Sequence, residues 1–205
     1  RALFSLDCET GQVSVRTADL DFETAATHDL FVVVTDSGTL PSRLSTTAKV
    51  TVALSDVNEA PVFVVPKLSL RVLENSTAGS TVGPRLVATD PDAGQTVKYE
   101  VTNGDVAFAV DATTGQLSVA SGALLDFETT PSLEVTVRAT DSSMEALFAS
   151  LTLTVDVVDV NEAPVLTVTN DVVVDENSEV GVAVRGLVPM AADPDAGQTL
   201  TYTLT

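Results

Sequence analysis

The hexapeptide Asp-Val-Asn-Glu-Ala-Pro occurs twice in this chain, at residues 56–61 (the first linker) and at residues 159–164 (the second linker). Each copy lies between two runs that alternate like β-strands. The closing Pro has no backbone N–H, so it cannot donate to a sheet ladder. The motif therefore predicts a connector between two β domains, and its acids, Asn and free carbonyls make that connector rich in oxygen acceptors.

Other motifs recur at nearly the same spacing, from 102 residues (Glu74 to Glu176) to 105 residues (Asp36 to Asp141), so the chain is an internal repeat. The recurring motifs are Thr-Gly-Gln-x-Ser-Val (10–15, 114–119), Leu-Asp-Phe-Glu (20–23, 125–128), Thr-Asp (35–36, 140–141), Glu-Asn-Ser (74–76, 176–178) and Asp-Pro-Asp-Ala-Gly-Gln-Thr (90–96, 193–199). Their register predicts the C-terminal part of one repeat at 1–61, a complete repeat at 62–164 and the N-terminal part of a third at 165–205, as in an excerpt of a longer protein.

The complete repeat has the pattern of an all-β fold. Residues 133–140 and 151–157 alternate apolar and polar side chains, as strands with one buried and one wet face do. Thr-Gly at 114–115 separates two short apolar runs and predicts a hairpin whose Gly takes a positive φ. Further strands are expected at about 67–73, 82–88 and 97–102. Seven short strands in about 100 residues indicate an immunoglobulin-like sandwich, although the Cys-Trp-Cys core of true immunoglobulin domains is absent.

Charge and composition exclude several classes of protein. The 29 acids outnumber the 10 bases, and the net charge of -19 argues against nucleic acid or anionic lipid as a direct partner. A hydrophobic content of 44% excludes a disordered acidic tail. Cys8 is the only cysteine, so no disulfide can form within the chain, and we expect it in the turn of an exposed hairpin. The longest apolar runs, such as 30–34, are too short to span a bilayer.

The acids of the recurring motifs are spaced so that they share a face. In an extended Leu-Asp-Phe-Glu the apolar pair points to the core and the two acids point outward together. In Asp-Pro-Asp the Pro biases the first Asp to an extended conformation, so the two Asp can share a face. The carboxylates expected at the second linker are Glu74, Asp126, Glu128, Glu162, Asp193 and Asp195. Within one Debye length, about 8 Å, they would repel one another without cations.

Ca²⁺ is the cation that such a set of oxygens suits, since it takes about six to eight oxygen ligands. The alternative for any single Asp is an ordinary solvated loop residue. An EF-hand does not fit, because a loop starting at Asp90 would place Gly94 at position 5 and Val101 at position 12.

The motifs Glu-Asn, Asp-x-Asp, Leu-Asp-x-Glu, Thr-Asp and Asp-x-Asn-Glu-x-Pro, in this order, make the chain resemble tandem cadherin repeats over nearly its whole length. The resemblance implies seven-strand Greek-key sandwiches and about three Ca²⁺ ions between successive repeats. At the first linker it implies the ligands Asp21, Glu23, Val57 (carbonyl), Asn58, Glu59, Ala60 (carbonyl), Asp90, Asp92 and Asp141. At the second linker it implies Glu74, Asp126, Glu128, Val160 (carbonyl), Asn161, Glu162, Ala163 (carbonyl), Asp193 and Asp195.

The sequence departs from the usual cadherin pattern at two places. Glu59 and Glu162 stand in the linkers where the family commonly has Asp, which keeps the charge and shifts the oxygens by one methylene. Thr96 and Thr199 stand where the family often has Asn, and the resemblance implies a carbonyl ligand there.

By resemblance we expect calcium-dependent, homophilic cell adhesion, with the chain a rigid rod segment at the extracellular face of the plasma membrane. The partners would be the same or related cadherin-like chains, with membrane attachment, as part of a single-pass protein, only through parts outside this sequence. The alternatives are a passive extracellular spacer and a secreted protein. A glycosidase with paired carboxylates is disfavoured, because the chain has no Trp, two Tyr, one His and no Gly-x-Ser-x-Gly motif. We therefore expect no enzyme.

One outward position departs from the repeat. Phe31 and Val33 stand where the sister strand has Thr136 and Arg138. They predict either a lateral contact patch or a locally covered face.

Overall fold

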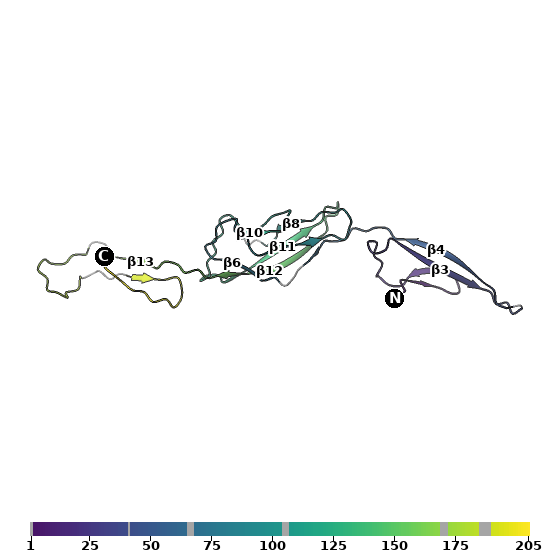
Figure 1. Ribbon diagram of the computed structural model, residues 1–205, viewed down its shortest axis with the longest axis horizontal. Coiled ribbons are helices and arrows are strands. Elements are labelled where there is room, and N and C mark those ends of the chain that lie inside the picture. The colour runs from purple at the N-terminus through teal and green to yellow at the C-terminus, as the bar shows by residue number, and fades with distance from the viewer. Residues whose placement is uncertain (1, 41, 65–67, 104–106, 169–171, 185–189) are drawn as a thin grey trace. The chain divides into compact units, whose positions relative to one another are not determined.

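The computed structural model describes residues 2–40, 42–64, 68–103, 107–168, 172–184 and 190–205, and in this part of the chain it consists of strands and turns without a helix (Figure 1). No helix that could cross a membrane occurs among these residues. The chain divides into two compact units. Unit 1 comprises Arg1–Val64, Ala88–Lys98 and Ala139–Ala149; unit 2 comprises Val65–Val87, Tyr99–Arg138 and Ser150–Thr205.

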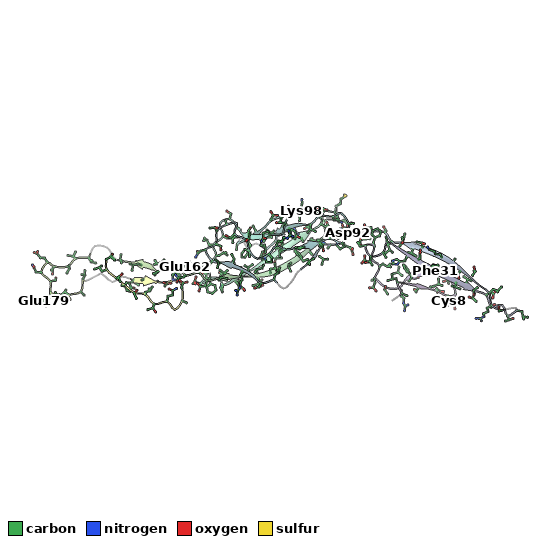
Figure 2. The ribbon with its side chains drawn as sticks, viewed as in Figure 1. Cys8, Phe31, Asp92, Lys98, Glu162 and Glu179 are labelled. Atoms are coloured by element: carbon green, nitrogen blue, oxygen red, sulfur yellow. The ribbon has the colours of Figure 1, made fainter. Side chains whose placement is uncertain are left out.

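Unit 1 holds three antiparallel strand pairs: β1 (Phe4–Leu6) with β2 (Val13–Val15), β3 (Thr27–Thr35) with β4 (Ser45–Ala53), and β5 (Val62–Phe63) with β7 (Ala88–Thr89). The long pair β3–β4 is easily followed in Figure 1. Cys8 is exposed in the turn between β1 and β2, which confirms its expected position. Phe31 and Val33, on the face of β3 opposite to Leu30 and Val32, are 68% and 55% exposed (Phe31 is labelled in Figure 2).

Unit 2 contains most of a four-stranded sheet of order β6-β12-β11-β8 and two antiparallel pairs, β9–β10 and β13–β14. These strands are β6 (Leu70–Leu73), β8 (Lys98–Val101), β9 (Phe108–Val110), β10 (Leu117–Val119), β11 (Ser132–Thr140), β12 (Phe148–Val158), β13 (Val165–Thr167) and β14 (Met190–Ala192). The parallel pairing of β6 with β12 runs from Leu70↔Val155 to Leu73↔Val158, so both strands finish side by side at the same end of the sheet.

The core of unit 2 is formed by apolar side chains of the four-stranded sheet, of β10 and of the segment that contains Val82 and Leu86. They are Leu70, Val72, Val82, Leu86, Leu117, Val119, Val135, Val137, Val155 and Val157, all buried. Along β11 the buried Val135 and Val137 alternate with more exposed residues, which confirms the predicted period of two. Burial of these side chains drives the two layers together, because each fully buried Val or Leu contributes about 1.5–3 kcal/mol.

The hairpin predicted at Thr114-Gly115 is present as β9–β10, with Val110 opposite Leu117. Gly115 has φ +71°, and a Cβ there would lie 2.3 Å from the carbonyl oxygen of Leu86. The Leu86 N–H donates to the Gly115 carbonyl at 2.9 Å. The close approach of these two backbones therefore requires glycine at this position.

The strand expected at 82–88 is wrong for most of its length, since residue 88 alone of this range lies in a strand, as the first residue of β7. Gly83 has φ +60° and is followed by Pro84, which has no N–H to give to a ladder. The backbone still donates single hydrogen bonds from Val82 to Leu117 and from Leu86 to Gly115. Of the strand expected at 67–73, residue 67 lies outside the described residues, and β6 begins at Leu70.

Candidate metal centre

Glu74 connects the end of β6 to the second linker within unit 2. It follows Leu73 directly, and its own N–H donates to the Val158 carbonyl at 3.0 Å, continuing the β6–β12 pairing. The side chain is 2% exposed. Its Oε1 accepts the Val160 N–H at 2.6 Å, and its Oε2 accepts the Phe127 N–H at 2.8 Å. The parallel register therefore carries a buried carboxylate to the linker and to the Leu-Asp-Phe-Glu segment.

Further carboxylates of unit 2 gather around Glu128. Oxygens of Glu74, Glu128 and Glu162 lie within 4.8 Å of one another, and so do those of Glu128, Asp159 and Asp195. We call these five residues the second acidic cluster. Glu162 lies in the segment that joins β12 to β13 (Figure 2), and its Oε1 accepts the Asn75 amide at 2.6 Å.

The Asp-Pro-Asp turn docks on the second linker through a carboxylate that accepts a backbone N–H of the linker. Asp195 donates its N–H to Asp193 Oδ1 at 3.0 Å, and its Oδ2 accepts the Glu162 N–H at 2.9 Å. Asp195 is buried, and its Oδ1 finds no hydrogen-bond donor among the described residues. A buried carboxylate oxygen without a donor indicates a site for water or a cation.

The first linker, in unit 1, repeats this arrangement. Oxygens of Glu23, Asp56 and Asp92, the first acidic cluster, lie within 4.8 Å of one another. Asp92 Oδ2 accepts the Glu59 N–H at 2.9 Å, as Asp195 does from Glu162 in the second linker. The Asp92 N–H donates to Asp90 Oδ1 at 3.0 Å, and the other oxygen of Asp90 is buried without a donor in the described part of the chain.

Asn58 fastens the first linker to the Thr-Asp motif. Its side-chain amide donates to Asp141 Oδ2 at 2.9 Å, and Asp141 is buried. The structure thus brings Asn58, Glu59, Asp90, Asp92 and Asp141 together as the sequence predicts. Residues Val57, Ala60, Val160 and Ala163, predicted to offer carbonyls, lie in the two linkers outside any strand.

Asp21 and Asp126 lie outside both acidic clusters. Each carboxylate accepts the N–H and the hydroxyl of the Thr three residues on, Thr24 or Thr129, at 2.7–3.0 Å. The hydroxyl of Thr24 and, next, its N–H lower the pKa of Asp21. The N–H of Thr129 and then its hydroxyl lower the pKa of Asp126. Both acids therefore hold a turn, and their role as metal ligands stays a prediction.

Asp56 and Asp159 are two cluster members that sequence reasoning missed. Both are the first residue of the repeated hexapeptide, and each enters a group of three carboxylates. Asp159 comes directly after the last residue of β12. The position of Asp159 could have revealed it, because an acid directly after β12 lies beside Glu74 once β6 and β12 pair.

The acidic clusters raise the pKa of some of their own members. Desolvation, followed by the charge of Asp195, raises the pKa of Asp159. The backbone N–H of Glu128 lowers the pKa of the Glu128 carboxyl. Desolvation and the charges of Glu74, Asp159 and Glu162 outweigh this effect, so the pKa of Glu128 is raised. Glu23 shows the same balance, its pKa raised by desolvation and by Asp56, Glu59 and Asp92 despite its own N–H.

The donor set fits a hard divalent cation. The clusters consist of carboxylates, with Asn amide oxygens beside them and no His or Cys, and oxygen-only sets suit Ca²⁺ or Mg²⁺ rather than Zn²⁺. The two ion pairs found in the described residues, Asp29–Lys49 and Glu100–Arg138, do not involve the cluster acids. One buried oxygen of Asp90 at the first linker and one of Asp195 at the second linker lack a donor among the described residues, and a bound Ca²⁺ would satisfy them.

Comparisons with known proteins place this chain in a family. A family model described as the cadherin domain matches residues 68–158. Protocadherin Fat 2 of Mus musculus is 34% identical over 202 residues, covering 95% of this chain and 4% of that protein. Protocadherin alpha-4 of Rattus norvegicus is 31% identical over 208 residues, covering 98% of this chain and 21% of that protein. The chain thus spans a small fraction of these relatives.

Solved structures show the same fold. Cadherin-23 EC22-24 of mouse has a TM-score of 0.60 at 26% identity, covering 95% of this chain and 62% of that chain. Protocadherin Gamma B7 cadherin domains 1-4 have a TM-score of 0.62 at 25% identity, covering 95% of this chain and 48% of that chain. The predicted all-β Greek-key sandwiches are confirmed. Cadherin domains are adhesion-related extracellular domains without enzymatic activity, so the expectation of no enzyme is also confirmed. This chain is therefore built of cadherin repeats.

Proposed function

We propose that this chain binds Ca²⁺ at both linkers and serves as a calcium-rigidified part of an adhesion protein at the extracellular face of the plasma membrane. The observation that carries the proposal is the convergence on Glu128 of four other carboxylates, Glu74, Asp159, Glu162 and Asp195, without a basic partner among the described residues. Like charges held this close repel one another unless a cation lies among them.

The residues that would hold the ions are those predicted from the sequence, together with Asp56 and Asp159. Asp159 brings the six carboxylates expected at the second linker to seven, against six positive charges on three Ca²⁺ ions. The resemblance supports about three ions per linker. Bound ions supply positive charge that the chain lacks there and tie the linker to segments on both sides of it. Extracellular modules bind Ca²⁺ with a Kd on the order of 10⁻⁴ to 10⁻³ M.

Calorimetric titration of the metal-free protein with Ca²⁺ tests this proposal. Glu128→Gln keeps the size of the side chain and removes the charge that both groups of the second acidic cluster share. We expect the Kd of the weakened sites to rise by at least the roughly tenfold that loss of an outer-shell partner costs. Glu134→Gln, the same change at an exposed residue of β11 in the same unit, is the matched control. Equal affinities in the two variants, or no heat of binding in the parent, would refute the proposal.

Homophilic adhesion by the parent protein is part of the proposal, with the same or related cadherin-like chains as partners. One similar structure, of protocadherin gammaB7 EC3-6, is described as a cis-dimer, at 26% identity and a TM-score of 0.57. The competing function is a passive spacer, and attachment as a single-pass protein competes with secretion. Beads coated with the full-length protein should aggregate only with Ca²⁺ if it is adhesive and should stay dispersed in both conditions if it is a spacer.

A further inference from the structure

Two glutamines outside the predicted ligand sets make the same bridge at the two linkers. Gln95 Nε2 donates to Asn58 Oδ1 at 2.5 Å and to Asp92 Oδ2 at 3.2 Å. Gln198 Nε2 donates to Asn161 Oδ1 at 2.8 Å and to Asp195 Oδ2 at 3.0 Å. The first bridge lies in unit 1 and the second in unit 2, so the arrangement is formed twice.

The backbone of the Asp-Pro-Asp-Ala-Gly-Gln segment places this side chain. Gly94 has φ +86° and Gly197 has φ +83°, a conformation that reverses the chain and that glycine adopts at least cost. The Gln95 N–H donates back to the Asp92 carbonyl at 3.3 Å. The turn therefore returns each glutamine over the second Asp, next to the linker.

The glutamine amide shares its Asp acceptor oxygen with a backbone N–H of the linker. Asp92 Oδ2 accepts both Glu59 N–H and Gln95 Nε2, and Asp195 Oδ2 accepts both Glu162 N–H and Gln198 Nε2. Two successive linker residues, the Asn and the Glu, are thus tied to one carboxylate oxygen. If the linker moved away from the turn, the bond from the Glu N–H to the Asp and the bond from the Gln amide to the Asn would be lost together.

The amide nitrogen occupies a position that favours positive charge. It lies between an Asn oxygen and an Asp oxygen, both predicted Ca²⁺ ligands, and the reversed amide would face these two acceptors with its own oxygen and repel them. Gln95 adopts this orientation although its Oε1 is buried without a donor among the described residues. The polarised N–H groups therefore compensate part of the negative charge of the linker.

We propose that Gln95 and Gln198 are positioning residues that hold the linker on the Asp-Pro-Asp turn in the metal-free protein. Their amides keep the Asn oxygen and the Asp carboxylate close before an ion binds. The Asn oxygen has a second lone pair and the Asp carboxylate has a second oxygen, so the same side chains can also serve a cation. Preorganised ligands lose less conformational freedom on binding. This inference rests on the proposed calcium binding for its purpose, but the bridge itself is a property of the metal-free chain.

The test is amide hydrogen exchange of the Glu59 and Glu162 N–H groups in the full chain, in EDTA and in saturating Ca²⁺. The double variant Gln95→Met and Gln198→Met keeps an unbranched side chain of similar length and removes the donor. We expect these two amides to exchange about two- to tenfold faster in EDTA, the range that corresponds to one net hydrogen bond. In Ca²⁺ the difference should shrink, because the ion would hold the same Asn and Asp side chains.

The control is Gln12→Met in the β1–β2 hairpin, where Gln12 Nε2 donates only to the neighbouring Val13 carbonyl among the described contacts. It should leave both linker amides unchanged. Gln198→Met alone should affect only Glu162, which keeps the test valid if the double variant folds poorly. Unchanged exchange in EDTA, or an equal increase with and without Ca²⁺, would overturn the positioning role. If the parent protein binds no Ca²⁺, the proposed function fails, whereas the exchange in EDTA still decides whether the bridge exists.

Discussion

Glu74 Oε1 accepts the backbone N–H of Val160 at 2.6 Å, although 86 residues separate the two in the chain. The second oxygen of the same carboxylate accepts the Phe127 N–H. One buried acid thus holds three segments of unit 2 together: the end of β6, the Leu-Asp-Phe-Glu segment and the second linker. It belongs to the second acidic cluster as well, so its structural and ligand roles can be separated only by measuring with and without metal.

Replacing Glu74 should destabilise the protein even in EDTA. Glu74→Ala leaves two backbone N–H groups without their acceptor, and each unsatisfied buried group costs about 1–3 kcal/mol. Glu74→Gln keeps one acceptor oxygen and should lie between the parent and the Ala variant. Thermal unfolding in EDTA measures the effect, with Glu134→Gln as the control. A melting temperature of Glu74→Ala equal to that of the parent would show that these hydrogen bonds add nothing to stability.

Removal of Ca²⁺ should lower the melting temperature, because an ion bound only to the folded state stabilises it by mass action. One site at a Ca²⁺ concentration of 100 times its Kd contributes about 2.7 kcal/mol. Mg²⁺ should restore less stability, since it is smaller and demands an octahedral set of ligands. Calorimetric scans with EDTA, Ca²⁺ and Mg²⁺ provide the measurement. Superimposable curves in EDTA and Ca²⁺ would count against metal binding at either linker.

Gly115→Ala should destabilise unit 2 more than Gly122→Ala. Both glycines have a positive φ, +71° and +82°, so both substitutions carry the backbone strain of about 1–2 kcal/mol. A Cβ at residue 115 would also lie 2.3 Å from the Leu86 carbonyl oxygen, whereas nothing lies within 4 Å at residue 122. Urea unfolding measures the free energy of unfolding of the two variants, and the difference between them gives the cost of the steric clash at residue 115. Equal loss of stability would mean that the Leu86 segment moves away freely.

The Asp111 turn should make a contribution to stability that depends on pH. The N–H of Thr114, and then its hydroxyl and the Thr113 N–H, lower the pKa of Asp111 below 3.8. A carboxyl whose pKa is lower in the folded state stabilises the protein above the unfolded pKa and loses this effect as pH falls through the folded pKa. Asp111→Asn should therefore be less stable than the parent at pH 7, and the gap should close as the pH falls through the lowered pKa of Asp111.

Denaturant unfolding of both proteins in EDTA, between pH 7 and pH 2.5, measures this gap. The metal-free condition is needed because protons would otherwise also compete with Ca²⁺ for the acidic clusters. A gap of constant size over the whole range would show that the charge of Asp111 does not matter and that the Asn amide disturbs the turn in another way.

The parts of the fold that the sequence predicted well are those set by local pattern. Alternation identified β11 and β12, and Thr-Gly identified the β9–β10 hairpin, because side-chain period and positive φ are properties of a few neighbouring residues. The segment at 82–88 was predicted less well. Its apolar residues suggested a strand, but Gly83 and Pro84 interrupt the ladder while Val82 and Leu86 still enter the core.

The order of motifs along the chain was enough to predict the fold class, the repeat and the acidic, oxygen-rich character of the two linkers, because residue types and spacing are written in the sequence. The tertiary structure alone decided which oxygens meet. Pairing of β6 with β12 brings Glu74 to Val160, places Asp159 in the second acidic cluster, and leaves Asp126 in a turn outside it. Likewise, the bridge from Gln198 to Asn161 and Asp195 depends on a docked linker. The physical reason is that electrostatic and hydrogen-bonding contacts act over a few ångströms in space, between residues that can be far apart along the chain.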